Sequence, residues 1–127
     1  MLKIDNENMI IALTRGDTAN IVFSAVDEQG TSYTPVANDK LTFSVAKKVG
    51  QDPVFEPITN TMISSATDFW TITLQPAHTN NLKFGDYVFD VQLTRYNGGN
   101  EEVDTIIGTT DDMKPTFRVW GEVSPEV

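Results

Sequence analysis

The single histidine is the first residue to test for catalysis, because histidine is the commonest general base near neutral pH. His78 lies in a polar, proline-led connection at residues 76–81, and no serine or acid nearby in the sequence completes a recognisable triad. Distant partners stay open, because the fold rather than sequence spacing assembles such triads. We interpret His78 as a solvated loop residue and predict that the protein is not an enzyme.

Acidic side chains gather late in the chain, where a calcium site is physically conceivable. They are Glu101, Glu102, Asp104, Asp111 and Asp112. Calcium needs several oxygen ligands, but the chain has no Asp-x-Asp-x-Asp loop with its glycine and terminal glutamate. We interpret these acids as a solvated surface that protects a strand edge from pairing. We predict no cofactor and leave open whether the acidic loops bind a cation.

The aromatic residues raise a third kind of site, because sugar rings stack on exposed aromatic side chains. Four aromatic residues fall in phase with neighbouring apolar positions and are predicted to be core: Trp70, Tyr87, Phe89 and Phe117. Three others fall out of phase: Phe69, Tyr96 and Trp120. These three are the candidate contact surface, although a sandwich edge or a second sheet would bury them equally well.

Two short motifs have structural explanations. Arg15-Gly16-Asp17 spells the tripeptide that integrin receptors read, but we predict a tight turn in which glycine supplies the backbone freedom. Asn-Gly-Gly-Asn at residues 97–100 joins two strands and has no helix after it. We therefore predict a hairpin tip there and not a phosphate-binding loop.

Composition excludes several further classes. The net charge is −9, with 18 acidic against 9 basic residues, so nucleic acid and anionic membranes are poor partners. The absence of cysteine excludes disulfides, thiolate zinc sites and cysteine nucleophiles. No apolar run is long enough to span a bilayer, and we expect no secretion signal at the N-terminus.

Short strands must position these residues, because apolar and polar side chains alternate along much of the chain. Predicted strands lie at 9–13, 19–26, 41–46, 69–75, 87–94, 103–107 and 117–120, with short or edge strands at 54–55 and 58–63. Residues 76–81 connect two strands and include at most one helical turn. We predict an all-β fold: one immunoglobulin-like β-sandwich of seven to nine mostly antiparallel strands over residues 1–127, with a core at about 8–123.

The clearest alternation is in the strand that begins after Gly85. Its apolar side chains point to one face: Tyr87, Phe89, Val91 and Leu93. Its polar side chains point mostly to the other: Asp86, Asp90, Gln92 and Thr94. The first set is predicted to be core.

The segment from Trp70 to Gly108 contains three successive patterns: Trp70-x-Ile72-x-Leu74, Leu82-x-Phe84-Gly85-x-Tyr87 and Thr105-Ile106-Ile107-Gly108. In this order of patterns the segment resembles small β-sandwich domains of tailed bacteriophages and prophages. A tryptophan-bearing strand before a similar Leu-x-Phe-Gly-x-Tyr segment is found in the N-terminal domains of baseplate upper proteins. The resemblance implies a role in assembly without enzymatic residues.

Two functions are therefore expected. The first is a phage or prophage virion structural protein, an accessory or connector part of the tail, baseplate or capsid that docks on other virion proteins and self-associates. Its expected docking edges lie near residues 54–63 and 117–120, since an unpaired edge accepts a partner strand. The alternative is a carbohydrate-binding or cell-surface adhesion domain that uses Phe69, Tyr96 and Trp120.

Overall fold

The fold is all-β, as the sequence predicts. The computed structural model describes residues 2–5, 7–24, 33, 35–61, 69–97, 99–110 and 113–121. These residues form nine strands and one helical turn: β1 (Leu2–Asp5), β2 (Ile10–Thr14), β3 (Ala19–Phe23), β4 (Lys40–Ala46), β5 (Ile58–Thr61), β6 (Trp70–Leu74), α1 (Pro76–Thr79), β7 (Gly85–Asn97), β8 (Asn100–Ile107) and β9 (Thr116–Trp120).

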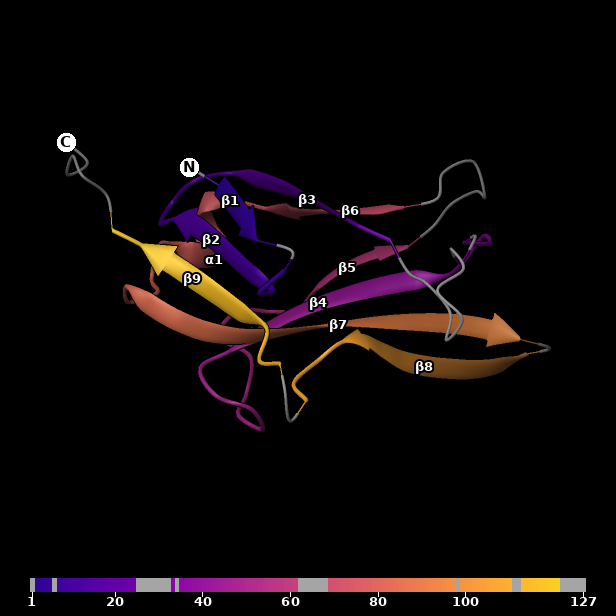
Figure 1. Ribbon diagram of the computed structural model, residues 1–127. Coiled ribbons are helices and arrows are strands. Elements are labelled where there is room, and N and C mark those ends of the chain that lie inside the picture. The colour runs from indigo at the N-terminus through magenta and orange to yellow at the C-terminus, as the bar shows by residue number, and fades with distance from the viewer. Residues whose placement is uncertain are drawn as a thin grey trace.

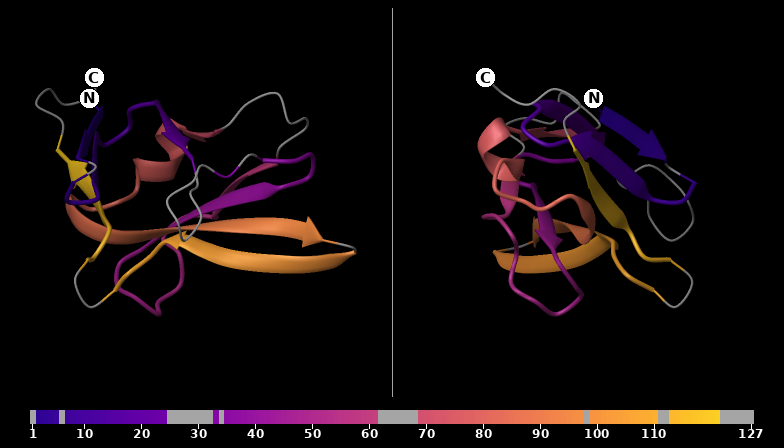
Figure 2. Two further views of the ribbon diagram at one scale, coloured as in Figure 1. Left: turned by 45° about the vertical axis from the view of Figure 1, so that its right-hand side comes forward. Right: turned by 90° about the vertical axis from the view of Figure 1, so that its left-hand side faces the viewer.

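The strands form two sheets that enclose one core (Figure 1). The larger sheet has the order β1-β2-β9-β7-β4-β5, and β8 also pairs with β7. The smaller sheet contains β3 and β6. All of these pairs are antiparallel except β2 with β9, which is parallel. The rotated views in Figure 2 show the smaller sheet lying across one face of the larger one.

The alternating strands bury the faces that the sequence predicts. Leu41, Phe43 and Val45 of β4 are fully buried, and the same alternation buries three residues of β6. All four predicted core positions of β7 are buried as well, and so are the four in-phase aromatic residues. Alternation locates these residues because a strand in a sandwich turns every second side chain toward the opposite sheet.

Strand β7 lies inside the larger sheet, and with 13 residues it is longer than any strand that pairs with it. Along one edge it pairs with β4 from Val88 to Thr94. Along the other edge it pairs first with β9, up to Val88, and then with β8, from Val91 onward. The hairpin that joins β7 to β8 closes with Asn97 opposite Asn100, and Gly99 has φ +86°, which confirms the predicted glycine turn.

The structure corrects several strand predictions. Strand β9 is not an edge, because it lies between β2 and β7. Strand β1 was not predicted, although it extends the sheet beyond the expected core boundary. Residues 54–55 form no strand, and only an isolated bridge joins Pro53 to Ala46. Strand β5 does lie at a sheet edge, as predicted. Residues 25–26 and 62–63 of two predicted strands lie outside the described residues.

Candidate functional site

A hollow on the larger sheet arises where β7 changes partner. Strands β9 and β8 share one edge of β7, and between their pairings lie only Phe89 and Asp90. The β7–β8 ladder also shifts register between Val91 and Gln92, as a β-bulge does. Bulges bend a strand and redirect its side chains, and they are common next to functional sites. The sheet therefore opens beside Asp90.

A loop that follows β4 forms the opposite wall. Residues 47–53 turn back sharply, with Gly50 at φ +85° and the Gln51 amide donating to the Lys48 carbonyl oxygen at 3.1 Å. The Val54 amide then donates to the Val45 carbonyl oxygen at 2.8 Å, which returns the chain to β4. Residues 105–109 complete the enclosure from the side of β8. The result is an open hollow of about 520 Å³, which we call the Asp90 hollow.

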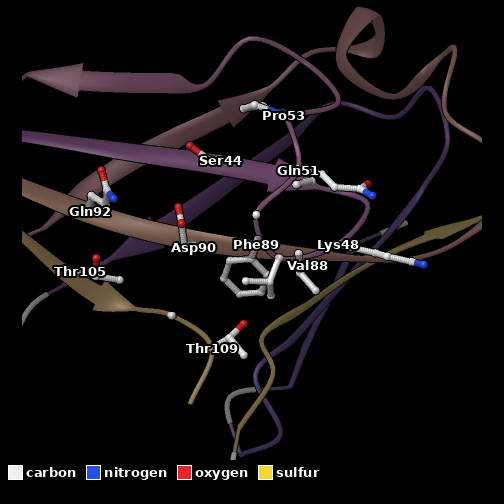
Figure 3. Close-up of a pocket in the computed structure, with 14 residues that line it drawn as sticks. Ser44, Lys48, Gln51, Pro53, Val88, Phe89, Asp90, Gln92, Thr105 and Thr109 are labelled. Carbon is white, nitrogen blue, oxygen red and sulfur yellow. The ribbon is translucent and has the colours of Figure 1, made fainter. Parts of the chain in front are cut away.

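Polar side chains without formal charge surround Asp90. Figure 3 shows its carboxylate between Ser44 of β4 and Gln92 of β7 on one side and Thr105 and Thr109 on the other. The Lys48 side chain also lines the hollow but extends away from Asp90 (Figure 3). Among the described residues, the Asp90 carboxylate forms neither a hydrogen bond nor an ion pair, and partial burial raises its pKa above the usual aspartate range.

A glycine packs closely against Thr105 at the rim of the hollow. A Cβ atom at Gly108 would approach the Thr105 Cγ2 atom to 2.8 Å, closer than such atoms pack. Next to this rim is a second, mainly apolar hollow of about 400 Å³, lined by Met9, Ile106, Ile107, Met113 and Pro115 among others. The two hollows share Thr105, Gly108 and Thr109, so the chain leaving β8 separates them.

His78 has a structural role in this fold. It is partly buried in α1, the helical turn that the connection was expected to allow, and is therefore not a solvated loop residue. Its Nδ1 atom accepts a hydrogen bond from the Gln75 amide at 2.8 Å, and its ring packs on Phe55 with centroids 5.1 Å apart. These contacts fix the start of the turn.

The three out-of-phase aromatic residues do not form one surface. Phe69 directly precedes β6 of the smaller sheet and is 44% exposed, whereas Tyr96 is 46% exposed near the end of β7. Trp120 is only partly buried, but it ends β9, which pairs with the beginning of β7. Because Gly85 pairs with Val119, about 35 Å of strand separates Tyr96 from this end of the sheet.

The acidic segment of β8 is partly neutralised. The Arg95 guanidinium forms ion pairs with Asp104 and, at 3.5 Å, with Glu102. Within the described part of the chain, no three aspartate, glutamate or histidine side chains gather closely enough to hold a metal ion. Asp111 and Asp112 lie outside the described residues.

The Arg15-Gly16-Asp17 motif forms the predicted tight turn. The Asp17 amide donates to the Thr14 carbonyl oxygen at 3.1 Å, and Gly16 has φ +85°. The Gly16 amide donates to the hydroxyl of buried Thr79 at 2.8 Å, which ties the turn to α1. The Arg15 guanidinium also lies 4.4 Å from the centre of the Phe84 ring.

Known protein families and curated proteins give no direct guide to the site. No protein-family model and no curated protein matches this chain. In the described part of the chain, no helix is long and apolar enough to cross a membrane. The function has to be argued from the geometry itself.

Sequence reasoning placed Asp90 only on the polar face of β7 and did not select it as a site residue. The sequence did contain a signal that Asp90 is unusual, because aspartate is disfavoured in the middle of a strand. Its flanking polar neighbours Gln92 and Thr94 carry no charge that would pair with it. The sequence could not show that β7 changes its partner from β9 to β8 beside Asp90, which opens the sheet there.

The unpaired carboxylate predicts a stability change. Asp90→Asn should raise the free energy of unfolding at neutral pH by about 0.5 kcal/mol, because an amide is cheaper to desolvate than a carboxylate. Since the folded-state pKa of Asp90 is raised, the original protein loses stability as pH rises through that pKa. The extra free energy of unfolding of the Asp90→Asn variant should therefore disappear in acid, where the Asp90 carboxyl group is protonated. Lys48 is the other ionisable residue lining the hollow.

Urea unfolding between pH 3 and 8 measures this difference, and Asp86→Asn is the matched control. Asp86 lies on the same strand, but the Arg118 guanidinium lowers its pKa, so its replacement should destabilise the protein at neutral pH. Equal effects of the two substitutions would contradict the prediction.

Proposed function

We propose that this protein is a non-enzymatic structural component of a tailed phage or prophage virion, an accessory or connector of the tail, baseplate or capsid. The residues that carry the resemblance form one continuous unit, β6-α1-β7-β8. In the virion, this unit would dock on other virion proteins.

The observation that carries the proposal is the free edge of β8. This strand is eight residues long and pairs with β7 along one edge, while the described residues place no strand on the other. Its residues 100–105 are all exposed, including the apolar Val103, which is 52% exposed. An unpaired edge of this length pairs with a partner strand through main-chain hydrogen bonds if the partner's side chains compensate the acidic ones of β8, which otherwise oppose pairing.

The charge of β8 favours a different protein over a second copy at this edge. Two β8 strands side by side would bring together two sets of Glu101, Glu102 and Asp104. Arg95 compensates only part of this charge within one copy. Like charges on adjacent strands are destabilising, so a partner that carries basic residues fits better.

Location in a particle tests the function. The chain should sediment with virions or tail structures on a density gradient after induction of the encoding phage, and its gene should lie beside tail, portal or baseplate genes. Its absence from purified particles, with no such genes alongside, would overturn the proposal.

Self-association is expected to use β1, another edge strand of the larger sheet. Ile4 is 44% exposed on this strand, which ends the larger sheet. Ile4→Lys should shift the protein from dimer toward monomer in light scattering at high concentration, because a charge on an edge strand blocks pairing. Val22→Lys is the control, since Val22 is similarly exposed on β3 of the smaller sheet. A strict monomer before substitution would contradict self-association.

A glycan-binding function is the second candidate, and Tyr96 is the residue that favours it. Its exposed ring lines a separate shallow hollow of about 420 Å³ together with Asn38, Lys40 and Thr61. An aromatic ring beside amide, ammonium and hydroxyl groups suits a sugar. Titration with host wall polysaccharide, followed by NMR, should shift the Tyr96 signals under this alternative. No shift at millimolar glycan would remove it.

A further inference from the structure

We propose that the Asp90 hollow binds a basic side chain, arginine or lysine, from the protein on which this chain docks. The inference rests on the proposed function and names the contact that would give it specificity. Three features of the hollow carry the proposal: an unpaired carboxylate, uncharged polar side chains next to it and a position beside the free edge of β8.

The first feature is the unsatisfied carboxylate. Asp90 is partly buried and, within the described residues, accepts no hydrogen bond and meets no cation. A carboxylate removed from water needs donors to compensate the lost hydration. Two other aspartates differ in this respect, since Asp86 of β7 is paired with Arg118 and Asp104 of β8 is paired with Arg95. Asp90 is thus available for a ligand that brings donors.

The second feature is the chemistry of the walls. Ser44, Thr105, Gln92 and Thr109 offer hydroxyl and amide groups, which hydrogen-bond to a guanidinium or ammonium group without neutralising Asp90. The Lys48 amino group extends away from the carboxylate (Figure 3). The net charge of −9 further favours the approach of a cation.

A sugar fits this hollow less well. Among the described residues, the one aromatic residue that lines it is Phe89, whose side chain is only 3% exposed because its ring packs into the core. Without an exposed ring on which a sugar could stack, the carboxylate is the dominant recognition group. Arginine suits it best, because the planar guanidinium binds a carboxylate through two parallel hydrogen bonds.

The third feature is position. A partner strand on the free edge of β8 would lie two strand spacings, about 10 Å, from β7. An extended arginine and the Asp90 side chain together span this distance. The Thr105 side chain, which lies between them on β8, lines the hollow. One partner segment can therefore pair with β8 through its main chain and reach Asp90 with one side chain.

Short blocked peptides test this contact on the intact protein. We would titrate Ac-Gly-Arg-Gly-NH2, Ac-Gly-Lys-Gly-NH2 and Ac-Gly-Gln-Gly-NH2 into the ¹⁵N-labelled chain and follow backbone amide shifts. The arginine and lysine peptides should cause saturable shifts at Ser44, Asp90 and Thr105, and the glutamine peptide should not. Asp90→Asn should weaken the arginine peptide about tenfold or more, as expected when a charged acceptor is removed. Asp86→Asn, which removes the same charge elsewhere on β7, should leave binding unchanged.

The outcomes separate the site from the function. Equal shifts with the glutamine peptide, or arginine binding that survives Asp90→Asn, would overturn the basic-side-chain site. Shifts caused by glycan but not by the arginine peptide would also overturn it. Failure to find the chain in virions while the arginine peptide binds would instead reject the virion role and retain the site. Presence in virions without peptide binding would reject the site alone.

Discussion

Phe43→Ala should lower the free energy of unfolding by about 3–5 kcal/mol, the loss expected when a fully buried aromatic side chain is truncated. The Phe43 side chain is fully buried in β4, where the two sheets meet. Its ring centre lies 5.9 Å from that of Phe23, 5.6 Å from that of Phe89 and 6.1 Å from that of Phe117. Alanine would leave a cavity among these rings and remove the contact that joins β3 of the smaller sheet to β4 of the larger one.

Urea unfolding followed by tryptophan fluorescence measures this loss, because Trp70 is buried in the same core. Phe84→Ala is the matched control: its ring is 55% exposed and stacks under Arg15, so the loss should stay near 1 kcal/mol or below. Total stability of a small domain is only about 5–15 kcal/mol, so Phe43→Leu gives a second, milder variant that should keep the protein folded. Similar losses at Phe43 and Phe84 would contradict the shared aromatic core.

The sequence predicts the strands of this fold well because many of them bury only one of their two faces. In β4 and β6 every second residue faces the opposite sheet, so the apolar positions of each strand can be read directly, for example Phe43 and Trp70. The tip between β7 and β8 is equally local, since two glycines suit the positive φ values of a short hairpin. These features depend on neighbouring residues alone.

Pairing between distant strands is not local, and there the sequence-based prediction was wrong. Phe117 and Val119 alternate with Arg118 in β9, a pattern that fits an edge strand as well as an interior one. In the structure β9 lies between β2 and β7, and Arg118 reaches Asp86 across the sheet. The alternation fixes which face of β9 is buried but not which strands flank it.

The Asp90 hollow was missed for the same reason. Its floor comes from β7, and its walls come from the loop after β4 and from the end of β8. It exists because β7 is longer than the partner strands on one edge, which forces a change from β9 to β8. The sequence-based prediction gave this strand only residues 87–94, whereas β7 has 13 residues, and partner choice is a property of the whole sheet. Asp90 therefore becomes a candidate only once the topology is known.

Asp39→Ala should lower the free energy of unfolding by about 2–4 kcal/mol, because it removes a fully buried carboxylate and leaves the two donors that it binds without that acceptor. Asp39 is fully buried, and its Oδ2 atom accepts hydrogen bonds from the Tyr33 hydroxyl at 2.6 Å and the Val36 amide at 3.0 Å. The Asp39 amide in turn donates to the Val36 carbonyl oxygen, which closes a turn in which Asn38 has φ +77°. The carboxylate thus fixes the backbone at the start of β4.

The titration of Tyr33 separates this network from a general loss of packing. Burial, and then the hydrogen bond to Asp39 and its charge, raise the pKa of Tyr33 to about 12. Without the carboxylate that pKa should fall toward the ordinary tyrosine value, which ultraviolet absorbance of tyrosinate measures. Asp39→Asn keeps an acceptor and should lose less stability, while Asp86→Asn removes an exposed ion pair and should cost about 1 kcal/mol at most. A Tyr33 pKa unchanged in Asp39→Ala would show that the hydroxyl does not depend on Asp39. The stability loss would then come from the turn alone.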